Sequence, residues 1–200
     1  MINDIHDLGL VLDSKVKLVV IESWDERRVL ETLTSLAVKR GLGLYTWAVT
    51  EGLQRLGFAA DVSEESASLE PEAALKLIKH DPQPNLYVLC DLHPFLVDNP
   101  KLVRLLKEIA LAEGAHKPTL VLVSHALKLP VEVQRYAARF ALALPSEEEL
   151  LTIVRDEATR WSEGNRGARV RTDNRTLQQV VKNLRGMSHA EARALARRVI

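Results

Sequence analysis

The sequence lacks the features of several protein classes. It has a single cysteine, Cys90, which lies within an apolar run and has no second cysteine with which to form an internal disulfide. No stretch reaches the roughly 18 uninterrupted apolar residues that a membrane-spanning helix needs. The first residues are acidic where a secretory signal would be basic. Together these absences predict a cytoplasmic protein with no membrane partner.

An excess of one charge is also missing, because 27 basic and 27 acidic side chains cancel. The balance is uneven along the chain: residues 1–159 carry 17 basic against 24 acidic side chains, and residues 160–200 carry 10 against 3. This asymmetry favours docking of the basic tail on its own body, on a neighbouring copy or on an anionic partner. The tail has only Trp161 for stacking on bases, so we expect no nucleic-acid partner.

Apolar strand runs alternate with helical patterns along most of the chain, which is typical of a parallel sheet covered by helices. The runs are nearly continuous in Val, Leu and Ile, as expected for strands that are buried on both faces. The sequence therefore predicts an α/β fold with a five-stranded parallel sheet and flanking helices. The strands are expected at residues 18–21, 44–49, 86–90, 120–123 and 140–144.

Apolar residues at helical spacing predict crossover helices around residues 29–37 and 102–110. Ser23 and Glu26 have the spacing of a capping box, in which each side chain satisfies the other's backbone N–H. The first helix is therefore expected to begin directly after the first strand.

The strand pattern stops at Pro145, and only helical patterns follow. We therefore divide the chain into an α/β body, residues 1–144, and a small helical lid-like subdomain, residues 145–200. Three helices are expected in the subdomain. Capping boxes begin the first and third of them, at Ser146 with Glu149 and at Ser188 with Glu191.

Polar residues that follow the strands are the candidates for chemistry, because ligands of open parallel sheets bind beyond the carboxyl ends of the strands. Asp91 ends an apolar run, where many nucleotide hydrolases hold a magnesium-binding aspartate, but Leu92 follows where a glutamate is usual. His93 and His125 could join Asp91 in a zinc site. The alternative is that both are strand-end residues with ordinary hydrogen bonds. Trp24 and Trp47 either cover the core or form a partner surface.

A phosphate-binding loop is absent from the sequence. Such a loop needs glycines that let backbone N–H groups close on phosphate, together with a lysine and a Ser or Thr. None of the nine glycines begins that pattern. After the first strand the chain instead carries Glu22, Ser23, Trp24, Asp25 and Glu26, whose carboxylates would repel a triphosphate. We therefore expect no ATP hydrolysis by these 200 residues.

The phrases LVVIESWDERRVLETL, LYVLCDLHPFL, TLVLVSHALKLP and LALPSEEEL resemble the N-terminal, Walker-A-lacking domain of the plastid and cyanobacterial type of AAA ATPases, which also occur in other bacteria. The resemblance runs from about Leu8 to Ile200. It implies a degenerate AAA+ or P-loop NTPase-like topology, with Asp91 at the Walker B position and Ser124 at the sensor 1 position. Asn or Thr would be commoner than Ser124.

The resemblance also implies a function for the chain. It would be a noncatalytic N-terminal regulatory or protein-interaction domain of an AAA+ ATPase, with ATP and magnesium bound by a complete AAA+ module that follows in the parent protein. We assign no cofactor and no metal to this domain itself. Its implied partners are that C-terminal module and other proteins, and AAA+ relatives also imply homo-oligomers.

A receiver-like signalling domain is the alternative. Asp25 and Glu26 could bind magnesium, Asp91 could accept phosphate, and Ser124 could end the fourth strand. Against it, Leu144 stands where receivers carry a lysine, the excursion of residues 50–85 is too long for one short helix, and the helical subdomain has no counterpart.

The last expected helix carries three arginines spaced to line one side of it, Arg193, Arg197 and Arg198. In AAA+ proteins, lid arginines sense nucleotide in a neighbouring subunit. The alternative is a solvated basic face that complements the helix dipole.

Overall fold

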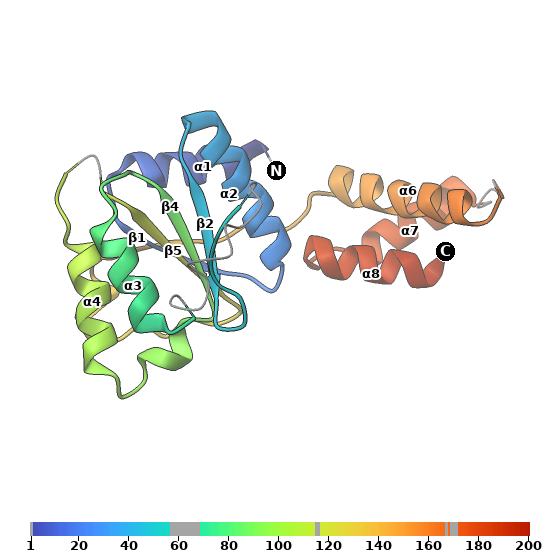
Figure 1. Ribbon diagram of the computed structural model, residues 1–200. Helices are drawn as coiled ribbons and strands as arrows, with labels where there is room; N and C mark the ends of the chain where they lie inside the picture. The colour runs from blue at the N-terminus through green and yellow to red at the C-terminus, as the bar shows by residue number, and fades with distance from the viewer. Residues whose placement is uncertain (1, 57–68, 115–116, 167, 169–171) are drawn as a thin grey trace. The chain divides into compact units, whose positions relative to one another are not determined.

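Six strands form one sheet in the computed structural model, which describes residues 2–56, 69–114, 117–166, 168 and 172–200. The strand order is β3-β2-β4-β5-β1-β6 (Figure 1). Every neighbouring pair is parallel except β2 with β3. The strands are β1 (Leu18–Glu22), β2 (Leu44–Ala48), β3 (Gly52–Arg55), β4 (Leu86–Cys90), β5 (Thr119–Ser124) and β6 (Ala137–Phe140).

The prediction of a mostly parallel α/β sheet is confirmed, with two corrections at its edges. The antiparallel edge strand β3 was not expected. The last strand was expected at residues 140–144 but is β6, Ala137–Phe140. Its residues are only half-buried or exposed, because an edge strand has a neighbour on one side only, so β6 lacks the continuous apolar run by which the inner strands were found.

The strand order excludes the receiver alternative. Receivers have the flavodoxin-like order 2-1-3-4-5, in which the first strand lies beside the second. In this sheet β1 lies between β5 and β6, and β2 pairs with β4. The first strand therefore has neighbours that a receiver sheet does not allow.

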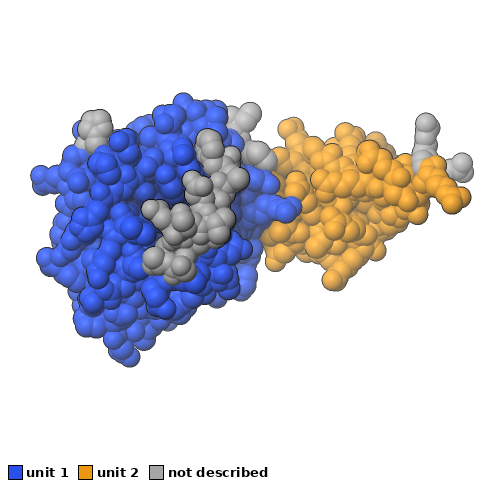
Figure 2. Space-filling model, in the orientation of Figure 1, with its two compact units in different colours: residues 1–142 blue, residues 143–200 orange. Residues whose placement is uncertain are grey.

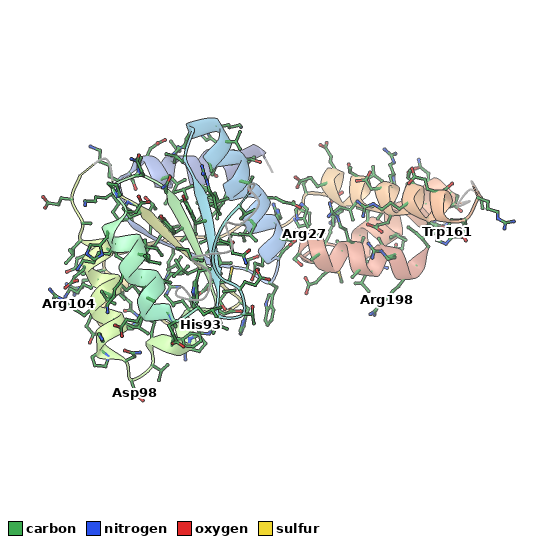
Figure 3. The ribbon with its side chains drawn as sticks, in the orientation of Figure 1. Arg27, His93, Asp98, Arg104, Trp161 and Arg198 are labelled. Atoms are coloured by element: carbon green, nitrogen blue, oxygen red, sulfur yellow. The ribbon has the colours of Figure 1, made fainter. Side chains whose placement is uncertain are left out.

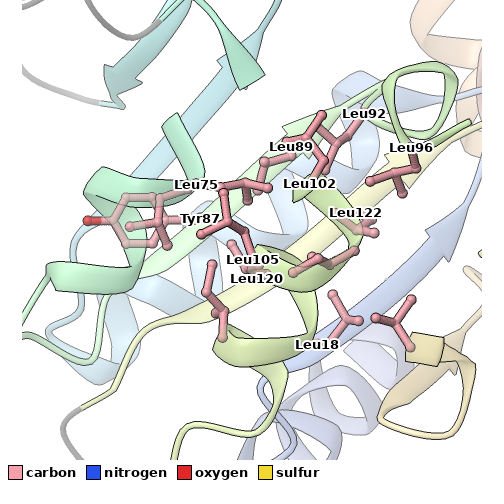
Figure 4. Close-up of a cluster of buried hydrophobic side chains, with 14 of the residues drawn as sticks. Leu18, Leu75, Tyr87, Leu89, Leu92, Leu96, Leu102, Leu105, Leu120 and Leu122 are labelled. Carbon is pink, nitrogen blue, oxygen red and sulfur yellow. The ribbon is translucent and has the colours of Figure 1, made fainter. Parts of the chain in front are cut away.

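Helices cover both faces of the sheet in the body (Figure 1). Successive strand residues point to opposite faces, so Val19 and Ile21 pack with α1 and α2, while Leu18 and Val20 pack in the cluster that includes α3 and α4. Figure 4 shows this second cluster. The helices of the body are α1 (Ile2–Asp13), α2 (Glu26–Arg40), α3 (Pro71–His80), the 3-10 helix η2 (His93–Leu96), α4 (Pro100–Ala110) and α5 (Val131–Gln134).

Helix α2 begins two residues later than the predicted capping box would place it. Asp25 is its N-cap, and its carboxylate accepts a hydrogen bond from the Arg28 N–H at 3.2 Å. The Ser23 hydroxyl instead accepts from the Asp25 N–H at 3.0 Å. A carboxylate at this position interacts more favourably with the helix dipole than a hydroxyl does, so Asp25 displaces Ser23 as the cap.

The chain divides into two compact units, Met1–Leu142 and Ala143–Ile200 (Figure 2). The second unit contains α6 (Glu147–Gly164), α7 (Asn174–Asn183) and α8 (His189–Val199). Both capping boxes predicted there are present, at Ser146 and at Ser188. Among its described residues, the buried core is formed by Leu150, Ile153, Val154, Val181, Leu184, Ala192 and Ala196.

Within the described residues, every helix is too short or too polar to cross a lipid bilayer.

Candidate functional site

The candidate residues that follow β1, β4 and β5 come together at one edge of the sheet. Register pairs Glu22 of β1 with Ser124 of β5, and Cys90 of β4 with Val123. The carboxyl ends of these parallel strands therefore share an edge, where ligands of open α/β sheets bind. His93 follows β4 at this edge (Figure 3). We call the surface formed by residues 22–26, 90–93 and 124–125 the strand-end site.

Asp91 and Ser124 are hydrogen-bonded to each other. The buried Ser124 hydroxyl donates to Asp91 Oδ1 at 2.5 Å. Asp91 has a φ of +51°, which aspartate tolerates better than most residues, and its N–H donates to the Val123 carbonyl at 3.0 Å. Its carboxylate is exposed to solvent. The two residues expected at the Walker B and sensor 1 positions are therefore side by side.

Glu22 is held in the body by an arginine and a backbone amide. Its Oε1 accepts from the Leu127 N–H at 3.0 Å and from Arg139 at 2.9 Å. The Leu127 hydrogen bond, followed by the hydrogen bond and charge of Arg139, lowers the pKa of Glu22. A carboxylate with its charge maintained by these partners is therefore the last residue of the first strand.

Sequence reasoning missed Arg139 as part of this site. The side chain belongs to β6, and the structure pairs Arg139 with Val20 of β1. The predicted strand at 140–144 left Arg139 outside the sheet. A predicted strand three residues earlier would have placed Arg139 beside β1. The sequence carries no signal for the register of this edge strand.

The connection from β1 to α2 is closed by its own hydrogen bonds. Only Ser23, Trp24 and Asp25 lie between the strand and the helix. The Ser23 N–H donates to the Ser124 carbonyl at 2.9 Å. The Asp25 carboxylate occupies the N-terminus of α2, where phosphate binds in phosphate-loop proteins. Some backbone N–H groups of this turn are thus already hydrogen-bonded within the protein, and the turn carries the negative charge of Asp25.

Carboxylates also surround Cys90 at the end of β4. Burial, followed by the charge and hydrogen bond of Glu26 and the charges of Asp91 and Glu51, raises the pKa of the Cys90 thiol to about 12. Glu26, Asp91 and Glu51 therefore all act on the thiol through their negative charge. The strand-end site is therefore electronegative, and Cys90 is a protonated, unreactive thiol near neutral pH.

Aromatic rings form the other part of the site. Trp24 stacks on His125 with ring centroids 4.5 Å apart, and His125 meets His93 edge to face at 6.1 Å. Nδ1 of His93 is buried, with no hydrogen-bond partner among the described residues. In that part of the chain, no three His, Cys, Asp or Glu side chains group closely enough to hold a metal. The two histidines therefore pack together without the ligand set of the zinc hypothesis.

The three arginines of the last helix differ in their contacts. Nε of Arg197 donates to Glu157 Oε2 at 3.0 Å, and Arg160 donates to Glu157 Oε1 at 2.8 Å. The Glu157 side chain is only 2% exposed. Arg193 contributes a smaller charge effect at the same carboxylate, while Arg198 is exposed (Figure 3). Arg197 therefore joins α8 to α6 within the helical unit.

Two family models match the chain. Residues 4–142 match the N-terminal domain of SpoVK-like AAA ATPases, and residues 148–200 match the second domain of the same proteins. No curated protein sequence matches it.

Solved structures of AAA proteins share the fold. The FIGL-1 AAA domain in complex with ADP has a TM-score of 0.61 at 15% identity, covering 90% of this chain and 59% of that one. Two variants of RuvB from Thermotoga maritima have TM-scores of 0.57 and 0.54 at 14% and 12% identity. Each match to RuvB covers 98% of this chain, and 60% or 58% of the RuvB chain. The chain thus spans about three fifths of these proteins, and identities this low show the fold alone.

Proposed function

Because the chain belongs to the SpoVK-like AAA ATPase family, we propose that it is a noncatalytic N-terminal regulatory or protein-interaction domain of a larger AAA+ protein. Residues 1–144 are its body without a phosphate loop, and residues 145–200 are a lid-like subdomain. ATP and magnesium bind in a separate AAA+ module of the parent protein. The partners of this N-terminal domain are that module and other cytoplasmic proteins, including further copies of the domain itself, rather than nucleic acid.

The observation that carries this proposal is the closed turn between β1 and α2. Asp25 caps the helix that would receive phosphate, and Glu22 is held ionised one residue before the turn. A phosphate charge 4 Å from one carboxylate meets a repulsion of about 4 kcal/mol at an effective dielectric constant near 20. No lysine or glycine lies within residues 22–26 to offset it. The site keeps the Asp91 and Ser124 pair, but its carboxylates repel the phosphate groups of the nucleotide that such a pair would contact.

Isothermal titration calorimetry with ATP and magnesium, combined with a phosphate-release assay, tests the proposal. We expect neither binding at micromolar nucleotide nor release of phosphate by purified residues 1–200. Micromolar binding with turnover that Asp91→Asn abolishes would contradict it. Asp156→Asn is the matched control, because Asp156 is an exposed carboxylate on α6 in the other unit.

A further inference from the structure

Trp24 is exposed at the strand-end site, and its ring stacks on a neighbouring side chain. Among the described large hydrophobic side chains it is the most exposed, at 78%, whereas Trp47 is fully buried in the core. His125 stacks on the Trp24 ring, and His93 packs against His125 in turn. Packing of the core therefore does not account for Trp24. An exposed aromatic ring is typical of a contact for a partner.

The charges around Trp24 indicate the chemistry of that partner. Asp25 and Glu26 follow Trp24 in the chain, and Asp91 is hydrogen-bonded to Ser124, the neighbour of the His125 that stacks on Trp24. The charge of Glu51 also acts on the Cys90 thiol at this end of β4. Within the described part of the chain, none of these four carboxylates forms an ion pair. Glu22, in contrast, is paired with Arg139. The surface therefore offers an aromatic face beside carboxylates that form no ion pair with any described residue, which is complementary to a cation.

We propose that the strand-end site docks an arginine side chain from a basic segment of another protein, with the guanidinium stacked on Trp24 and hydrogen-bonded to the neighbouring carboxylates. Arginine fits better than lysine, because its planar group stacks on aromatic rings and pairs with carboxylates through two parallel hydrogen bonds. This inference rests on the proposed function, since it names the chemistry of a partner for a protein-interaction domain. The same carboxylates that repel nucleotide would attract the basic segment of that partner.

The probe is a seven-residue peptide of alternating glycine and arginine, blocked at both ends, with matched lysine and citrulline peptides. Citrulline keeps the planar shape of arginine but carries no charge. The chain has three tryptophans, Trp24, Trp47 and Trp161, so the indole N–H signals in an NMR spectrum report on each one separately. We expect the arginine peptide to shift the Trp24 signal and to leave the buried Trp47 and the distant-in-sequence Trp161 unchanged.

Substitutions then assign the binding energy. Trp24→Ala should weaken the arginine peptide about two- to fivefold, the range for a cation and an aromatic ring at an exposed site, and Trp24→Phe should recover part of that loss. Trp161→Ala is the matched control and should change nothing. Glu26→Gln should weaken binding further, and the citrulline peptide should bind at least about tenfold less tightly than the arginine peptide, as expected when a charged hydrogen bond is lost.

Three results would overturn the inference: no binding of the arginine peptide, equal binding by Trp24→Ala, or a Trp24 signal that shifts with protein concentration alone. The last would assign the surface to a second copy of the chain. Nucleotide binding is measured on the same preparation. Turnover of ATP would contradict the proposed function, whereas failed peptide binding without turnover would reject only the arginine site.

Discussion

Replacement of Glu157 by glutamine should weaken the helical unit, because this buried carboxylate is a charged contact between α6 and α8. Its side chain is 2% exposed, and its two oxygens accept hydrogen bonds from Arg160 at 2.8 Å and from Arg197 at 3.0 Å. The Arg197 hydrogen bond is the main cause that lowers the pKa of Glu157. The carboxylate is therefore ionised in the folded unit well below neutral pH.

The magnitude follows from what glutamine keeps and what it loses. A hydrogen bond to a charged group contributes about 1.5–3 kcal/mol. Glutamine retains the shape and one acceptor. The side chains of Arg160 and Arg197 are 56% and 68% exposed, so water solvates them after the change. We therefore expect Glu157→Gln to lower the free energy of unfolding of this unit by about 1–2 kcal/mol.

The pH dependence of unfolding tests separately whether the ionised Glu157 carboxylate stabilises this unit. A glutamate whose folded pKa lies below its unfolded value of about 4.3 stabilises the fold above that value, and loses this contribution as the pH falls through the folded pKa. The difference between the native protein and Glu157→Gln should therefore be full at pH 6 and shrink below about pH 4.

Hydrogen exchange measured by mass spectrometry on the whole chain locates the effect, because peptides from α6 and α8 report on this unit alone. Glu163→Gln, an exposed position on the same helix, is the control and should change stability by less than about 0.5 kcal/mol. A change equally small for Glu157→Gln, or one that does not vary with pH, would refute the assignment.

Three further predictions concern the body. Gly41→Ala should lower the free energy of unfolding of the body by about 1 kcal/mol, because Gly41 ends α2 with a φ of +64°, which alanine adopts unfavourably. An unchanged midpoint of urea unfolding would contradict this. Leu122→Ala should cost about 2–5 kcal/mol, since Leu122 is fully buried in the central strand β5, and a smaller loss in the same titration would mean that the core relaxes around the change. Cys90 should react with a disulfide reagent at pH 8 at least about a hundredfold more slowly in the folded chain than in urea. The reason is that burial and nearby carboxylates raise its pKa to about 12. Equal rates would contradict the buried placement of Cys90.

Local sequence patterns were sufficient for the body's inner strands and for the caps of the last unit. The strands β1, β4 and β5 are buried on both faces, so their composition alone reveals them. Ser146 and Ser188 cap their helices through residues three positions away, which a sequence shows directly. The missing phosphate loop is equally local. The shared edge of Asp91 and Ser124 also followed, because parallel strands end on the same side of a sheet.

Contacts between distant segments required the tertiary structure. Glu22 and Arg139 are 117 residues apart, and their pairing depends on the register of an edge strand that has no continuous apolar pattern. Trp24 and Trp47 both belong to the strand-end regions in sequence, yet one is 78% exposed and the other is fully buried. Glu157 and Arg197 meet only because α6 and α8 pack together. Each of these depends on which surfaces face each other after folding, and no pattern within a single helix or strand contains that information.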